Sequence, residues 1–138
     1  MWQSELAGLK TLYVSGPSCS GGTDQTTWQL VASMTPPTGK YWIVYGIHKY
    51  HHGGTTTTGY SANASSYVRV VWEDNTTTDV ALEEDVHISD VTVDAAELTK
   101  AAGKFKRVKE IRLYARQVTD QGATVSASVR LAATEVPI

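Results

Sequence analysis

The 138-residue sequence lacks several features that mark particular protein classes. Its single cysteine, Cys19, cannot form an internal disulfide, which excludes a disulfide-stapled secreted domain. Its apolar runs all stop well short of the roughly 20 residues that a membrane-spanning helix needs. Charged residues make up only 19% of the chain and the formal net charge is −2, so the sequence has neither the charge of a disordered tail nor an overall basic excess for nucleic acid. We therefore expect no membrane and no nucleic-acid partner.

The two ends of the chain carry little information of their own. The first residues, MWQSELAGLK, lack the basic start, apolar stretch and small-residue cleavage site of a secretory signal, so we expect synthesis in the cytoplasm without a signal peptide. The length is that of one domain. We therefore expect a single domain over residues 1–138, with residues 1–8 as an N-terminal arm and residues 132–138 as a C-terminal tail.

The residues that are abundant favour β structure. Threonine, serine and valine are common, and 4 Trp and 7 Tyr stand against a single Phe. Eleven Gly and four Pro interrupt the chain at fairly regular intervals, as the turns of a small all-β domain do. Alternation of apolar and polar residues predicts about eight antiparallel strands, most clearly the last two, over residues 108–118 and 123–131. In residues 108–118, Ile111, Leu113 and Ala115 face one side and Arg112, Tyr114 and Arg116 the other, which predicts one buried face and one solvent face. Eight strands in this length fit a β-sandwich of two packed sheets, most naturally a jelly roll, with an immunoglobulin-like sandwich as the alternative.

Local patterns add detail to this sandwich. Asp94 and Glu97 form a helix start and Gly103 a helix stop, which predicts one short helical crossover near residues 94–102. Residues 26–34 alternate so that Trp28 and Leu30 share the apolar side, which predicts that both are buried. Residues 41–50 are apolar on both faces, as in a strand that is central or is covered by another subunit.

No constellation in the sequence predicts catalysis. The loop SGPSCSGG places Ser18, Cys19 and Ser20 between glycines, but none of the four histidines has the context of a base for such a nucleophile. The acidic run at residues 83–85 lacks the spacing of a calcium loop. We expect no enzyme activity.

The histidines near the middle of the chain are the best metal candidates. His48, His51 and His52 could bind Zn, Cu or Ni through their imidazoles. No cysteine pair or neighbouring carboxylate completes the set in the sequence. We therefore expect no metal and no cofactor, and interpret these histidines as a polar strand end at a rim or an interface.

Charge and aromatic residues point to binding. A basic stretch over residues 100–116 contrasts with acidic residues at 79–97, an asymmetry that favours docking by complementary charge. Trp28, Trp42 and Trp72 lie on the apolar sides of predicted strands, where core packing is the default. Tyr50 and Tyr60 flank the threonine-rich loop and are our candidate ligand-contact residues, with a glycan as the ligand.

The closing stretch, KEIRLYARQVTDQGATVSASVRLAATEVPI, together with the Thr/Ser/Gly-rich strands and the lack of a catalytic constellation, resembles small virion accessory proteins of tailed bacteriophages. These are capsid decoration (cement) proteins or the β-rich heads of fibres. The resemblance implies a non-enzymatic protein of the virion, made in the host cytoplasm, that forms a homo-oligomer, with a trimer favoured, and binds and stabilises a capsid surface. The alternative is a carbohydrate- or receptor-binding domain of a phage fibre, or a carbohydrate-binding module.

A sandwich of this size without a disulfide gains stability naturally by association, because conformational entropy offsets most of the hydrophobic gain. We assign the contact between subunits to the strand that is apolar on both faces and to the end of the C-terminal tail. Because Pro137 cannot extend a hydrogen-bond ladder, we expect the tail to end as a docking arm or to fray. The candidate interface residues are Tyr41, Ile43, Tyr45, Ile47, Pro137 and Ile138.

Overall fold

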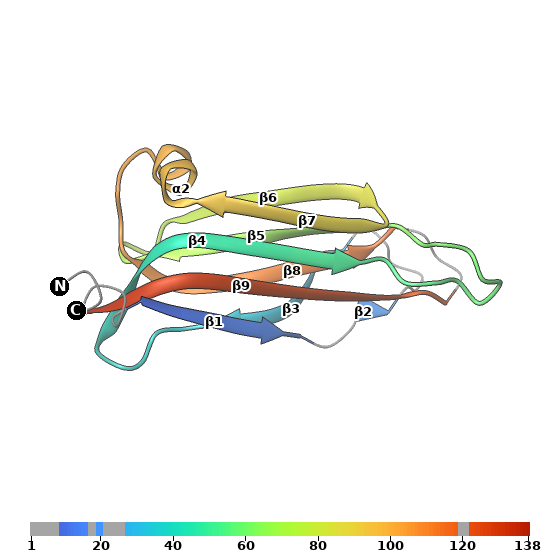
Figure 1. The fold of residues 1–138 in the computed structure, drawn as a ribbon, viewed down its shortest axis with the longest axis horizontal. Coiled ribbons are helices and arrows are strands. Elements are labelled where there is room, and N and C mark those ends of the chain that lie inside the picture. The colour runs from blue at the N-terminus through green and yellow to red at the C-terminus, as the bar shows by residue number, and fades with distance from the viewer. Residues whose placement is uncertain (1–8, 17–18, 21–26, 119–121) are drawn as a thin grey trace.

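The computed structural model describes residues 9–16, 19–20, 27–118 and 122–138, so the expected N-terminal arm lies outside the described residues (Figure 1). Most of the described chain is strand, and it contains one short helix. Its elements are β1 (Leu9–Ser15), β2 (Cys19–Ser20), β3 (Gln29–Met34), β4 (Lys40–His52), β5 (Ala64–Trp72), β6 (Thr77–Val86), β7 (Ile88–Asp94), α2 (Ala95–Ala102), β8 (Val108–Gln117) and β9 (Thr124–Pro137). In the described part of the chain, no helix is long and apolar enough to cross a bilayer.

The strands form two antiparallel layers. The first sheet has the order β1-β9-β4-β7 and the second sheet the order β3-β8-β5-β6, with β2 paired to the start of β9. One bridge, between Trp42 and Val108, joins β4 to β8 at one end. Because the chain passes repeatedly from one sheet to the other, the topology is a jelly roll, which confirms the predicted fold class.

The hydrophobic core fills the space between the two sheets. Side chains alternate along a strand, so every second residue points inward. The predicted alternation of the last two strands is confirmed, and Trp42 and Trp72 are also in the core, as expected. The largest fully buried apolar side chains are those of Trp42, Ile47, Ile111, Leu113 and Leu131.

The short helix lies where the sequence predicts it. The Asp94 side chain accepts a hydrogen bond of 2.8 Å from the backbone N–H of Glu97 and so caps the first turn of α2. Gly103 ends the helix in the left-handed conformation, at φ 83°, which favours glycine. The helix connects β7 of the first sheet with β8 of the second and buries Leu98.

Two β-bulges change which side chains of β3 and β4 point into the core, compared with the prediction from the sequence. The register of β4 against β9 shifts between Val44 and Gly46, so Tyr45 is an extra residue and the inward face changes phase. Ile47 is consequently 0% exposed, and its assignment to the interface is wrong. A similar shift between Leu30 and Ala32 leaves Leu30 53% exposed, although the sequence predicts it to be buried.

The sequence predicts a C-terminal tail over residues 132–138, but residues 132–137 belong to β9 and pair with β4. Pro137 is the partner of Lys40 at the end of this ladder. Among the described residues, β1 pairs with β9 as far as Thr134, the partner of Leu9. The N–H of Ile138 then donates to the carbonyl of Gly39 at 3.0 Å, which holds the chain end in place.

Candidate functional site

The outward surface of the second sheet carries a face of arginines and aromatic rings, which we call the arginine–aromatic face. It is built from β8 and β5, which pair directly, so that Tyr67 lies beside Tyr114 and Arg69 beside Arg112. These residues point outward because their neighbours along each strand, such as Val68 and Leu113, are buried in the core. The members of the face are Trp28, Tyr67, Arg69, Arg112, Tyr114 and Arg116.

The rings of this face hold one another in place. Tyr67 and Tyr114 stack with centroids 5.1 Å apart and planes 13° from parallel. The rings of Trp28 and Tyr67 form a T-shaped pair with their centroids 4.8 Å apart. The guanidinium of Arg116 lies 4.5 Å from the centre of the Trp28 ring, a cation–π contact. Burial raises the pKa of Tyr67, whose side chain is largely covered by these neighbours.

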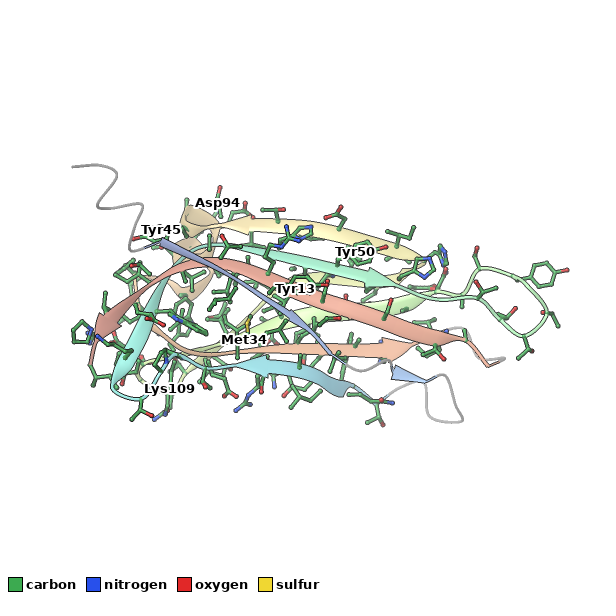
Figure 2. All side chains as sticks on the ribbon, turned by 60° about the horizontal axis from the view of Figure 1, so that its bottom comes forward. Tyr13, Met34, Tyr45, Tyr50, Asp94 and Lys109 are labelled. Atoms are coloured by element: carbon green, nitrogen blue, oxygen red, sulfur yellow. The ribbon has the colours of Figure 1, made fainter. Side chains whose placement is uncertain are left out.

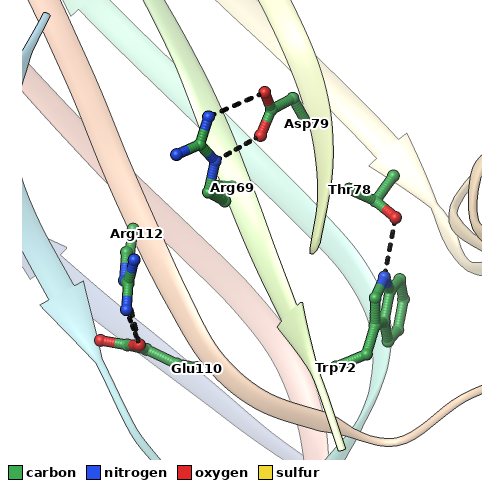
Figure 3. Close-up of polar contacts among 6 residues, drawn as sticks. All are labelled: Arg69, Trp72, Thr78, Asp79, Glu110 and Arg112. Atoms are coloured by element: carbon green, nitrogen blue, oxygen red, sulfur yellow. Dashed lines mark hydrogen bonds and ion pairs between the residues drawn. The ribbon is translucent and has the colours of Figure 1, made fainter. Parts of the chain in front are cut away.

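Two arginines stand side by side on this face, an arrangement that would be repulsive if both were unpaired. Arg69 donates two hydrogen bonds to Asp79, at 2.8 and 3.2 Å (Figure 3). Arg112 pairs with Glu110 at 2.8 Å, as Figure 3 also shows. The hydrogen bonds to Asp79 raise the pKa of Arg69 above its ordinary value, so the guanidinium is a permanent cation.

Beside the rings lies a hollow of about 280 Å³, which we call the Trp28 hollow. Leu82 of β6 forms part of its wall and is 55% exposed. The hollow thus combines apolar surface with one guanidinium and two carboxylates. Its lining residues are Trp28, Tyr67, Arg69, Asp79, Leu82 and Glu84.

Sequence reasoning found only parts of this face. It predicted that Arg112, Tyr114 and Arg116 face solvent, and the structure places them on the outer side of β8. It predicted that Trp28 belongs to the core, which is wrong because Trp28 is half-buried on the outer surface, between Arg116 and Tyr67. The grouping depends on the pairing of β5 with β8, and the sequence contains no signal for that pairing.

The outward surface of the first sheet carries a second face, which we call the tyrosine face. Tyr45 and Tyr50 of β4 lie on it with Tyr13 of β1, as Figure 2 shows. Of the predicted interface residues, Tyr41 and Ile43 also point to this side. They alternate along β4 with Trp42 and Val44, which are buried in the core. The members of the face are Tyr13, Tyr41, Ile43, Tyr45, His48, Tyr50 and Arg130.

A trough of about 280 Å³ crosses the tyrosine face at Gly46 and Ala132. Its walls include Arg130 and His48, which are partners on β9 and β4. The Nε2 atom of His48 contacts the Oδ1 atom of Asp90, and the guanidinium of Arg130 lies 5.5 Å from the centre of the Tyr13 ring. A Cβ added at Gly46 would meet only the carbonyl of Val93, at 3.7 Å, so the space above this glycine is open.

The other predicted binding residues lie at the two ends of the molecule. Arg107 brings Tyr41 and Pro137 together, because its guanidinium lies 5.1 Å from the Tyr41 ring centre and donates to the Pro137 carbonyl at 3.3 Å. Ile138 lies next to them at the chain end. Tyr60 lies in the loop between β4 and β5, which projects beyond the opposite end of the sheets (Figure 1). Tyr50 lies on the sheet itself, so the two predicted ligand-contact tyrosines belong to different surfaces.

The three histidines of β4 do not form a metal site. Alternation places His48 and His52 on the outer side, while His51 points into the core and is 0% exposed. Among the described residues, no three His, Cys, Asp or Glu side chains are grouped closely enough to hold a metal ion. Of the glycine-flanked loop, Ser18 lies outside the described residues and Cys19–Ser20 form β2.

Sequence reasoning also missed a buried polar network between the two sheets. Lys49 is 0% exposed, and its ammonium donates to the carbonyls of Ala81 at 2.7 Å and Ser66 at 3.3 Å. His51 contacts the Ser66 hydroxyl through Nδ1, at 2.5 Å, and the Val86 carbonyl through Nε2, at 3.0 Å. Burial lowers the pKa of Lys49 to about 8 and also lowers the pKa of His51.

Comparison with known proteins bears on the fold. No protein-family model matches the sequence, and no curated protein sequence matches it. VP2 of infectious bursal disease virus, solved as a subviral particle, overlaps 94% of this chain with a TM-score of 0.54 and 10% sequence identity, the overlap covering 33% of VP2. A mutant VP2 from derived T=1 particles overlaps 94% of this chain and 32% of its own, with a TM-score of 0.52 and 10% identity. This chain therefore spans about a third of VP2 and shares a jelly-roll fold with it.

Proposed function

We propose that this chain is a non-enzymatic structural protein of a virion. The observation that carries the proposal is the overlap of its jelly roll with VP2, a protein solved as a subviral particle, over 94% of the chain. In the finer form of the proposal, the chain forms a homo-oligomer, with a trimer favoured, and binds the surface of a capsid as a decoration protein, as its closing strands suggest. Decoration needs only modest affinity at each contact, because many copies bind one shell.

We assign the contact with other virion proteins to the tyrosine face. Tyrosine and arginine are enriched in protein interfaces because they bury large areas at a low cost in side-chain entropy. Tyr13 and Tyr45 are exposed on this face although they are large and partly apolar. The trough on this face is a socket into which a side chain of a partner can insert. Arg107 and Ile138 extend this surface to the end of the molecule.

The first experiment measures assembly of the purified full chain. Analytical ultracentrifugation and electron microscopy are carried out on the protein alone and after mixing with capsids of the virus whose genome encodes it. Trimers that bind capsids saturably support the decoration role. Closed particles formed by the protein alone would instead identify a shell subunit. A monomer at every concentration that does not bind capsids contradicts the proposal.

A substitution at Gly46 tests the assigned surface. Gly46→Phe fills the trough, and the open space above this residue lets the strand keep its backbone. We expect self-association or capsid binding to weaken by about tenfold or more, the effect of losing about 1.4 kcal/mol or more of binding free energy. Ser33→Phe is the matched control, because it adds the same ring at an exposed position of the other sheet. Equal effects of the two substitutions would show that the trough is not the contact.

A further inference from the structure

We infer that the Trp28 hollow of the second sheet binds a neutral saccharide. This activity goes beyond the proposed structural role and uses the opposite surface of the molecule. A virion protein with both properties would contact its own particle through the first sheet and a glycan through the second.

The apolar part of the hollow suits the ring of a sugar. Trp28, which directly precedes β3, and Leu82 of β6 both line the hollow, and Leu82 is more than half exposed. The C–H groups on one side of a pyranose carry a partial positive charge, and the face of an indole ring carries a negative one. A sugar that lies against Trp28 and Leu82 therefore covers apolar surface and gains a favourable electrostatic contact.

The polar part of the hollow supplies both donors and acceptors. Glu84 is exposed and makes no hydrogen bond or ion pair with any described residue, so its carboxylate can accept from a hydroxyl. Asp79 uses one lone pair on each oxygen for Arg69 and keeps the others. Arg69 likewise uses only two of its five N–H donors in this pair, and hydroxyl groups, which both donate and accept, match this mixture.

The charge of the hollow selects against anionic ligands. One guanidinium faces two carboxylates, and the guanidinium is already paired with one of them. A phosphate, a nucleic acid or an acidic sugar would therefore bring its negative charge close to Glu84 and Asp79. A neutral saccharide avoids this repulsion and can still use every polar group of the rim.

The side chains of the site are held before any ligand arrives. Tyr67 is 7% exposed and is fixed by the stacked ring of Tyr114 and by its T-shaped contact with the Trp28 ring. Its hydroxyl makes no hydrogen bond among the described residues and is an additional donor. Such preorganisation reduces the entropy lost on binding. The volume of about 280 Å³ is near the lower end of ligand sites, roughly 300–1,000 Å³, which favours one or two sugar units.

The test is an NMR titration of the isotope-labelled full chain with lactose, maltotriose and cellotriose as neutral probes and sialyllactose as the acidic probe. We expect at least one neutral probe to shift the indole N–H signal of Trp28, which Trp28→Phe identifies. We expect the Kd of that probe to rise by about tenfold or more in Trp28→Ala. Glu84→Gln should weaken binding in the same direction, and it keeps the shape of an exposed side chain, so it does not threaten folding.

Tyr50→Ala and Tyr60→Ala are the matched controls, because they remove aromatic rings that lie outside the hollow. Their affinity should equal that of the unmodified protein, as should that of Gly46→Phe, which tests the proposed assembly surface independently. The inference is overturned if none of the neutral probes shifts the Trp28 signal, if sialyllactose alone binds, or if the tyrosine controls lose binding while Glu84→Gln retains it.

Discussion

Lys49 and His51 are two residues of one strand that place ionisable groups inside an apolar sandwich. Both are 0% exposed. Burial of a charge is costly unless it is hydrogen-bonded, and the carbonyls of Ser66 and Ala81 provide this for the ammonium of Lys49. The neutral imidazole of His51 is satisfied by one acceptor and one donor, the Val86 carbonyl and the Ser66 hydroxyl. The fold therefore tolerates these side chains but favours their neutral forms.

His51 should make the protein less stable in mild acid. Its pKa is lowered in the fold, mainly by burial, so below the ordinary histidine pKa of 6.5 the unfolded chain binds a proton that the folded chain resists. The free energy of unfolding, measured by urea denaturation, should fall as the pH drops below about 6.5. In His51→Gln this loss should be smaller than in the unmodified protein. A pH profile of His51→Gln identical to that of the unmodified protein would contradict the explanation.

Lys49 should produce a second pH dependence on the alkaline side. Burial lowers its pKa from 10.5 to about 8, so between these values the unfolded chain holds more protons. The free energy of unfolding should therefore rise as the pH increases from about 8 to about 10.5. Lys49→Met should flatten this rise, and Lys109→Met, at an exposed position, should leave it unchanged. A rise that persists in Lys49→Met would have another source.

At the scale of single elements, the two bulges decide which side chains reach the core. Val31 is buried because the register shift in β3 turns it inward, while the same shift turns Leu30 outward. Val31→Ala should cost roughly 1.5–3 kcal/mol of unfolding free energy, and Leu30→Ala within about 0.5 kcal/mol, in denaturation experiments. The reverse order would mean that the strand follows the uninterrupted alternation of its sequence.

The sequence could predict the strands but not these bulges. Alternation identifies a strand because side-chain direction has a period of two. An extra residue changes the phase of this period without changing the composition, so Tyr45 and Val31 look like ordinary strand residues. The apparent double apolar face of β4 is explained by its bulge: Trp42 and Val44 point inward before it, and Ile47 points inward after it.

The helix, in contrast, is predicted by its ends alone, and its caps can be tested separately. Asp94→Ala removes the acceptor for the Glu97 N–H and should cost about 1 kcal/mol, while Asp94→Asn should cost less because its side chain still accepts. Gly103→Ala should also cost about 1 kcal/mol, since its φ of 83° is unfavourable for alanine. Thermal and urea denaturation measure both effects. Unchanged stability in Asp94→Ala would mean that the cap contributes nothing.

At the scale of the whole molecule, β9 is the strand on which the first sheet depends. It pairs with β1 on one side and β4 on the other, and Ala133 within it is 0% exposed. Deletion of residues 132–138, which the sequence predicts to be a tail, should therefore abolish cooperative unfolding measured by near-ultraviolet circular dichroism. Deletion of Ile138 alone removes only the bond to Gly39 and should be tolerated. A folded protein without residues 132–138 would show that the end of β9 is dispensable.

The fold could be predicted from the sequence to the level of a jelly roll, whereas the candidate sites could not. Strand alternation and the helix caps are local signals, and they sufficed for the two-sheet sandwich. The arginine–aromatic face joins Tyr67 and Tyr114, which are far apart in the chain and meet only through strand pairing. Because strand order cannot be read from one sequence, the sequence alone does not reveal the Trp28 hollow.

The loop between β4 and β5 makes the molecule easy to mark at one pole. Thr55 and Ser61 form an isolated bridge at the stem of the loop, and the N–H of Gly53 donates to the His87 carbonyl at 2.6 Å. Beyond this stem Tyr60 is 72% exposed, at the end of the sheets opposite to Ile138 and α2 (Figure 1). A short epitope inserted after Thr58 would thus act as a fiducial label, and antibody density in micrographs of a decorated shell would reveal which pole faces outward.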